Sequence, residues 1–155
     1  VAARRQDVRV ELSIIARARD VLFGRRPDLF VVEGAGGFLA PVNETQLIAD
    51  VAALFGFPVL IVAANKLGTI NHTLLTIESV LRRGLTIAGV VLNDVEFSDE
   101  SVADNAAEVA RLSGLTFLGQ IPRMSAVGAT EGVDLGAVAV ACLAAAGPPP
   151  PLAPS

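Results

Sequence analysis

Short apolar runs alternate with longer amphipathic stretches along most of this chain. The runs are broken by Gly, Pro, Asn and Glu, which is typical of strands buried on both faces of a parallel sheet. The predicted strands are 28–33, 57–63, 87–92 and 117–121. Apolar residues at helical spacing predict helices at 8–23, 45–55 and 70–83, one that ends at Leu112, and a last one at 135–146. Glycines close behind these helices, at 24, 56, 84 and 114, fit their C-caps.

Strands that alternate with helices predict a doubly wound parallel α/β sheet in a single domain, residues 1–146. Right-handed crossovers place the carboxyl ends of all strands at one edge of such a sheet. That edge would collect Glu33 with its glycines, the segment 65–71, the pair Asn93–Asp94 and the pair Pro122–Arg123. The Pro-rich end, 147–155, is expected to be a disordered tail.

Composition narrows the class of protein. The chain is 52% hydrophobic and 18% charged, which gives ample material for a core, while each apolar run is well short of a membrane span. A formal net charge of -4 and the lack of Trp and Tyr argue against a sequence-independent nucleic-acid binder. The single Cys142 excludes an internal disulfide and fits a reducing cytoplasm. We therefore expect a cytoplasmic protein that binds neither nucleic acid nor membrane.

The first candidate site follows the strand 28–33. Glu33 ends the apolar run, and glycines follow at 34, 36 and 37. Glycine permits a sharp turn that leaves backbone N–H groups free for a ligand. A carboxylate at the end of a parallel strand lies where open α/β sheets bind ligands. The alternative is an ordinary Gly-rich turn with Glu33 in solvent.

The second candidate site is the start of the helix near Thr69. The N–H groups of a first helical turn, together with the positive end of the helix dipole, attract a carboxylate or a phosphate. The hydroxyl of Thr69 and the amide of Asn71 can add hydrogen bonds. The alternative is that Thr69 merely caps its helix. His72 is the only histidine, so a transition-metal site is not indicated.

The third candidate site is the strand end at Asn93. An Asn side chain presents a donor and an acceptor to a purine edge, as it does to adenine; the alternative is an ordinary Asn-Asp turn. The sequence contains no GxxxxGK[ST] motif, and its glycines at 34, 36 and 37 do not satisfy GxGxxG because Leu39 occupies the last glycine position. These residues therefore include no phosphate-cradling P-loop.

Four segments together resemble dethiobiotin synthetase in their order and approximate spacing. They are Val32-Glu33-Gly34-Ala35-Gly36-Gly37, Pro58-Val59-Leu60-Ile61-Val62, Leu67-Gly68-Thr69-Ile70-Asn71-His72-Thr73-Leu74-Leu75-Thr76 and Gly89-Val90-Val91-Leu92-Asn93-Asp94. The Gly-Thr-Ile-Asn-His stretch is specific, whereas Glu-Gly-Ala-Gly-Gly is shared with related P-loop amidoligases. The resemblance extends from Ala2 to about Ala146 and corresponds to the C-terminal part of the family's length.

The resemblance implies a ligase of biotin biosynthesis that uses ATP and Mg²⁺ to close a cyclic urea from CO₂ and 7,8-diaminononanoate, through a phosphorylated carbamate. Glu33 would be the Mg²⁺ ligand, and the nucleotide phosphates would lie beside Gly34, Ala35 and Gly36. Asn93 and Asp94 would read adenine, and the other side of the base would meet Ile121, Pro122 and Arg123. The substrate carboxylate, which the family supplies across a homodimer interface, would bind at Gly68, Thr69, Ile70 and Asn71.

No catalytic residue can be assigned within the sequence. The family's P-loop with its phosphate Lys, and the residues that hold the diamine and carbamate, would lie upstream of Val1, and a chain without them should be nearly inert. The first hypothesis is the nucleotide- and substrate-binding portion of a dethiobiotin synthetase, with a P-loop NTPase-like fold that is incomplete at its N-terminus. The second is a non-catalytic nucleotide-binding or assembly subunit of the same fold. The third is a related amidoligase or a MinD-like ATPase, against which the Gly-Thr-Ile-Asn-His stretch speaks.

Overall fold

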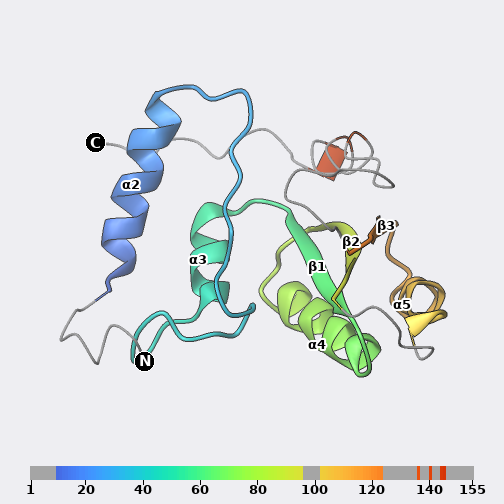
Figure 1. Ribbon diagram of the computed structural model, residues 1–155. Coiled ribbons are helices and arrows are strands. Elements are labelled where there is room, and N and C mark those ends of the chain that lie inside the picture. Colours follow the sequence, from blue (N-terminus) through green and yellow to red (C-terminus); the bar gives the residue numbers. More distant parts are fainter. Residues whose placement is uncertain (1–9, 96–101, 124–135, 137–139, 141–143, 146–155) are drawn as a thin grey trace. The chain divides into compact units, whose positions relative to one another are not determined.

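The computed structural model describes residues 10–95, 102–123, 136, 140 and 144–145. The chain divides into two compact units, which adjoin in the sequence between Phe57 and Pro58. The first contains α2 (Leu12–Gly24) and α3 (Ile48–Phe55), and the second contains a sheet with α4 (Thr69–Arg82) and α5 (Asn105–Ser113) (Figure 1). The predicted tail lies outside the described residues. Within the last predicted helix, the described residues are helical.

Parallel strands form the sheet of the second unit. β1 (Val59–Asn65), β2 (Ile87–Asp94) and β3 (Phe117–Ile121) lie in the order β1-β2-β3, and both pairings are parallel. In the sequence α4 lies between β1 and β2 and α5 lies between β2 and β3, and the two helices pack together and against the sheet. The predicted α/β class with a parallel sheet is therefore confirmed.

The core of the second unit forms where β2 meets the helices. Val90, Val91 and Leu92 are 2% exposed or less, because the central strand of a parallel sheet is apolar on both faces. Ile77 of α4 and Val109 of α5 join Val90 in one buried cluster. Among the described residues, no helix combines the length and the apolar character that a membrane span requires.

Helix α3 of the first unit begins later than the predicted residue 45. The Oδ1 of Asn43 accepts hydrogen bonds from the backbone N–H groups of Thr45 (3.0 Å) and Gln46 (2.9 Å), which holds a turn ahead of the helix. The N–H of Leu47 then donates to the Asp50 carboxylate at 2.7 Å. The Asn43 turn replaces the predicted first helical turn, and the Asp50 bond caps the helix at Leu47.

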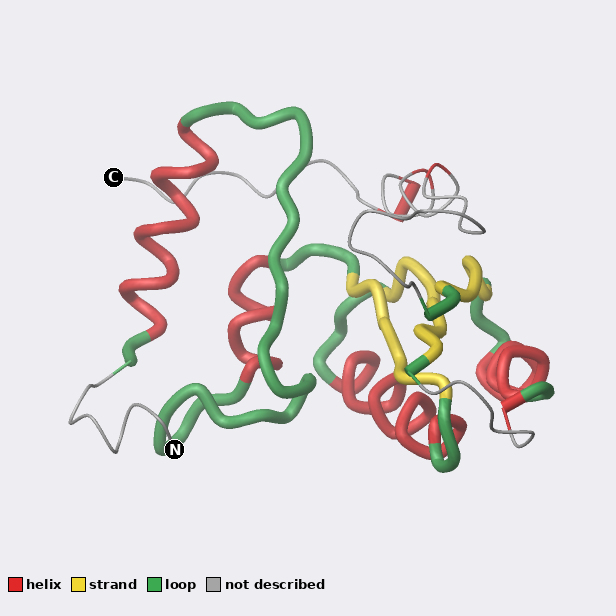
Figure 2. The backbone as a smooth tube through the Cα atoms, viewed as in Figure 1, coloured by secondary structure: helices red, strands yellow, loops and turns green. Residues whose placement is uncertain are grey.

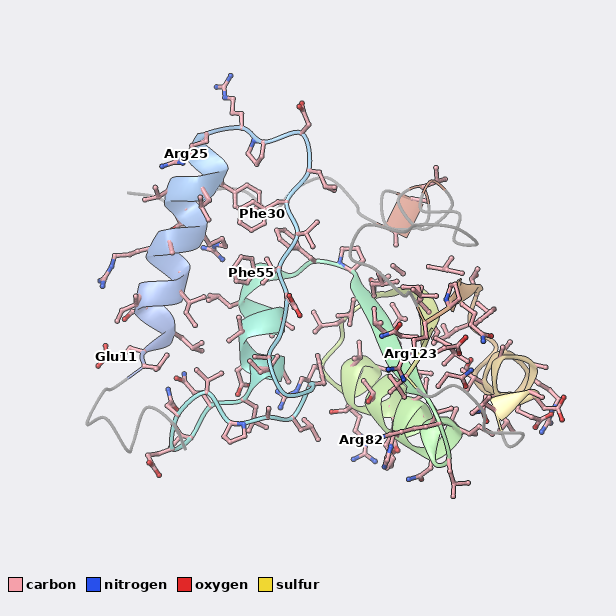
Figure 3. All side chains as sticks on the ribbon, in the orientation of Figure 1. Glu11, Arg25, Phe30, Phe55, Arg82 and Arg123 are labelled. Carbon is pink, nitrogen blue, oxygen red and sulfur yellow. The ribbon has the colours of Figure 1, made fainter. Side chains whose placement is uncertain are left out.

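Phenylalanine rings hold the first unit together. Phe23 of α2 stacks on Phe30 with ring centroids 5.0 Å apart. The ring centroids of Phe55 and Phe57 lie 6.1 and 5.9 Å from that of Phe30. Phe30 and Phe55 are labelled in Figure 3. Such pairs stabilise a structure beyond the apolar area that they bury. Phe30 therefore anchors the segment that leads to Glu33.

The predicted strand 28–33 does not form. These residues are a loop (Figure 2), and no backbone hydrogen bond joins them to another described residue. Val31 is 78% exposed and Val32 is 44% exposed. An apolar run becomes a strand only when a neighbouring strand satisfies its backbone N–H and C=O groups, and none of the described strands pairs with this run. The packing of Phe30 holds the segment instead.

Replacement of Leu92 by Ala tests the position of the core. Leu92 is fully buried, so Leu92→Ala should lower the free energy of unfolding by about 2–5 kcal/mol. Leu112→Ala is the matched control, because Leu112 is 48% exposed and should cost less than about 1 kcal/mol. Urea denaturation followed by circular dichroism measures both values. Equal losses in the two variants would contradict the described core.

Candidate functional site

The parallel register brings three strand ends to one edge of the second unit. Asn65 at the end of β1 is the partner of Asp94 on β2, and Asn93 is the partner of Ile121 at the end of β3. The predicted convergence of these three strand ends is therefore observed. Glu33 and its glycines belong to the first unit.

Asn93 offers an amide that the described residues do not use. It is half-buried at the end of β2, and its side chain bonds to no other described residue. Its donor and acceptor are the groups that recognise a purine edge. Beside it Ile121 is half-buried, while Pro122 and Arg123 are exposed. The Nη1 of Arg123 (labelled in Figure 3) donates to the carbonyl of Val95 at 3.1 Å and so links the ends of β3 and β2.

Asp94 lies in a different environment, because its carboxylate is already bonded. Its Oδ1 accepts hydrogen bonds from Asn65 Nδ2 at 2.7 Å and from Gln120 Nε2 at 2.8 Å, and its Oδ2 lies 2.9 Å from the same Gln120 nitrogen. The Oδ1 of Asn65 accepts from Asn105 Nδ2 at 2.9 Å. The sequence assigned no role to Asn65, Asn105 or Gln120. The signal in the sequence was Asn65 itself, a polar residue at the end of an apolar strand. The strand register then shows that Asn65 is the partner of Asp94.

The first turn of α4 presents backbone donors at the same edge. Gly68 is the N-cap, in a left-handed conformation with φ of 88°, and no side chain caps the helix. The alternative in which Thr69 is the cap is therefore wrong. The N–H groups of Ile70 and Asn71 have no acceptor among the described residues. Two free N–H groups at the positive end of a helix dipole can bind an anion.

Glycines shape the loop that follows Glu33 in the first unit. Gly36 and Gly37 have φ of 82° and 102°, a conformation that other residues rarely adopt. At Gly34, an added Cβ would lie 2.7 Å from the Cγ2 of Ile48, at the start of α3. The backbone conformation therefore favours glycine at 36 and 37, and the close contact with the Ile48 side chain favours glycine at 34.

The Glu33 carboxylate is accessible. Glu33 and Ala35 are exposed, and Glu33 makes no hydrogen bond or ion pair with another described residue. Within the part of the chain that the structure describes, no group of three or more His, Cys, Asp or Glu side chains could hold a metal ion. Mg²⁺ in nucleotide sites is bound by one or two carboxylates and completes its shell with phosphate oxygens and waters. A single accessible carboxylate fits that set of ligands.

Comparisons with known proteins confirm the resemblance drawn from the motifs. A family model described as "AAA domain" matches residues 1–131. The chain is 48% identical over 122 residues to the ATP-dependent dethiobiotin synthetase BioD of Anaeromyxobacter dehalogenans (strain 2CP-C). This match covers 78% of this chain and 54% of the relative. The protein of the same name from Akkermansia muciniphila is 39% identical over 122 residues, 78% of this chain and 57% of the relative. The chain therefore spans about half the length of the curated relatives it matches.

Substitution at Gly68 tests the N-cap of α4. Gly68→Ala should lower the free energy of unfolding by about 1–2 kcal/mol, because φ of 88° is strained for a residue with a Cβ. Space is not the limit, since the added Cβ would lie 3.6 Å from His72 Cε1. Gly68→Asn is the matched control and should recover part of the loss, because Asn tolerates left-handed backbone. Urea denaturation compares the two variants, and an equal loss in both would argue against a left-handed N-cap.

Proposed function

We propose that this chain, which belongs to the AAA domain family, is the part of an ATP-dependent dethiobiotin synthetase that recognises the adenine base and the carboxylate of the diamino acid. The observation that carries this proposal is the meeting of Asn93 and the first turn of α4 at one sheet edge. Identity of 48% to a dethiobiotin synthetase over 78% of the chain supports it.

We assign the carboxylate of 7,8-diaminononanoate to the first turn of α4. The free N–H groups of Ile70 and Asn71 can each donate a charge-assisted hydrogen bond to a carboxylate oxygen. The exposed Asn71 can add its side-chain amide. Thr69 is only 2% exposed, so its contribution is to pack the turn in place. The diamino acid would be held at this turn across a homodimer interface.

We assign adenine to the ends of β2 and β3. Asn93 is half-buried at the end of β2, and its side-chain amide supplies one donor group and one acceptor group for the base. The backbone of Ile121, Pro122 and Arg123 would lie at the other side of the base. Asp94 follows Asn93 directly, and its carboxylate bonds to the neighbouring strands.

We assign the phosphates and Mg²⁺ to the loop of the first unit, with Glu33 as metal ligand and Gly34, Ala35 and Gly36 beside the phosphates. Bound Mg²⁺ would neutralise charge on the transferred phosphoryl group. An amine of the substrate would add to CO₂ to give a carbamate, whose oxygen would attack the γ-phosphorus of ATP and release ADP. The second amine would then attack the carbonyl carbon, close the ring and release phosphate.

A chain extended by a P-loop is needed for this reaction. These 155 residues contain no GxxxxGK[ST] motif, and phosphoryl transfer depends on positioning and charge neutralisation of the phosphates. Recognition of the base and of the substrate carboxylate can be tested on the chain itself. We place the enzyme in the cytoplasm, where its nucleotide substrate is available.

Calorimetry with the chain tests the carboxylate site. We expect 7,8-diaminononanoate to bind without nucleotide, with a Kd of about 0.1–1 mM, or about 4–5.5 kcal/mol of binding free energy. The matched control is 2,3-diaminooctane, which has the same diamine but lacks the carboxylate, and it should give no binding heat. Equal heats from the two compounds would contradict the carboxylate assignment. The absence of heat from both would contradict a substrate site on this chain.

Replacement of Glu33 by Gln tests the Mg²⁺ assignment. In the enzyme that includes the P-loop, Glu33→Gln should lower kcat by roughly a hundredfold or more, because an amide is a weaker ligand for a hard cation. The free energy of unfolding should change by less than about 0.5 kcal/mol, since the side chain is exposed and bonds to no described residue. Turnover is measured by ADP release, and dimerisation is measured by sedimentation. Asp28→Asn, on the same exposed segment, is the control and should leave both unchanged. A parallel loss of turnover and dimerisation in Glu33→Gln would rule out a metal-ligand role.

A further inference from the structure

Four polar side chains form a hydrogen-bonded group at the carboxyl edge of the sheet. They are Asn65, Asp94, Asn105 and Gln120, here called the clasp. The Asp94 carboxylate accepts hydrogen bonds from Asn65 and Gln120, and the Asn65 amide oxygen accepts one from Asn105. The clasp thus joins the ends of β1 and β2 to β3 and to the first residue of α5.

The buried half of the clasp specifies one geometry. Asn65 is 2% exposed and Asn105 is 5% exposed. A buried side-chain amide is costly unless it is hydrogen-bonded, so Asn65 must meet Asp94 with its nitrogen and Asn105 with its oxygen at the same time. An aliphatic side chain could fill the same volume at this position without specifying which atoms meet. The polar pair therefore defines where the end of β2 lies.

We infer that Asp94 is a positioning residue for Asn93 and does not itself read the base. Successive side chains of a strand extend to opposite faces, so holding the Asp94 carboxylate fixes the backbone orientation from which Asn93 extends. Both Asp94 oxygens lie within 2.9 Å of a donor nitrogen of the clasp. A second link, from Arg123 to the carbonyl of Val95, holds the next residue of the chain. This inference rests on the proposed function, in which Asn93 recognises adenine.

Two substitutions open the clasp, and two others serve as references. Gln120→Ala removes a donor from an exposed position, so the fold should survive, and Asn65→Leu removes the buried donor. Asp94→Asn keeps an oxygen that can accept from Asn65 and is therefore the conservative variant. Glu78→Gln is the matched control, because it breaks only an exposed pair with Arg82 on α4.

Hydrogen exchange measures the clasp without any ligand. In Gln120→Ala and Asn65→Leu, the backbone N–H groups of residues 93–95 should exchange about tenfold faster, because a hydrogen bond to a charged group is lost. The N–H groups of residues 90–92 in the same strand should keep their rates, as should all N–H groups in Glu78→Gln. Unchanged exchange at 93–95 in both clasp variants would overturn the inference.

The preference for ATP over GTP shows whether Asp94 positions Asn93 or contacts the base itself. The ratio of the Kd values for GTP and ATP, measured by calorimetry, should fall about tenfold in Asn65→Leu and in Gln120→Ala, because Asn93 loses its fixed orientation. In Asp94→Asn the ratio should stay within about threefold of that of the unmodified chain. Loss of the preference in Asp94→Asn with unchanged exchange at 93–95 would overturn the inference, because Asp94 would then be the reader.

Asn93→Ala tests the function beneath the inference. This variant should lose the preference for ATP over GTP while residues 94 and 95 keep their exchange rates. A preference that survives Asn93→Ala, or an unmodified chain without preference, contradicts the proposed adenine site. The exchange comparison still decides whether the clasp holds the end of β2, so the two failures are distinguishable.

Discussion

Strand β2 constrains everything else in the second unit, because it pairs in parallel with a strand on each side. A chain that enters every strand in the same direction must return between strands, and it does so through a connection that crosses the sheet. Helices α4 and α5 lie in these connections, and Ile77 and Val109 of these helices bury Val90 of β2. The same constraint brings the ends of all three strands to one edge, where polar side chains replace the apolar ones.

Hydrophobic periodicity was enough to predict the elements that pack against β2. Helix α4 and strand β3 have nearly the predicted bounds, because each has one apolar face or run that burial can satisfy. The run 28–33 shows what periodicity cannot supply. Apolar side chains favour burial, but a strand also needs partners for its backbone N–H and C=O groups. In the first unit the run 28–33 has no such partners among the described strands, and the aromatic packing of Phe30 holds it in place. Asn43 and Asp50 moved the start of α3 for a local reason, since their side chains bond to nearby N–H groups.

The candidate site could be predicted from the sequence only where it depends on the local backbone. The start of α4 could be predicted, because the free N–H groups of a first turn are a property of any helix and Gly68 marks the turn before it. Asn93 could be predicted as a polar residue at the end of an apolar run. The clasp could not, because Asn65 and Asn105 are 40 residues apart in the sequence and each resembles an ordinary polar residue by itself. Their pairing depends on strand register and helix placement, which are tertiary properties.

In the proposed function, an anionic ligand at this edge meets a chain with a formal net charge of -4. Long-range attraction cannot account for binding, since charges more than about 8 Å away are largely screened at physiological ionic strength. At the start of α4, the groups proposed to act at contact distance are the free N–H groups of Ile70 and Asn71, which are neutral, oriented and supported by the dipole of the helix. Donors that are held in place need no reorganisation when charge arrives. A carboxylate at the same edge would oppose an anion, and the hydrogen bonds from Asn65 and Gln120 stabilise the Asp94 carboxylate within the protein. Amide donors of Asn65 and Gln120 therefore satisfy the Asp94 carboxylate, and the free N–H groups at the start of α4 remain for the proposed anion.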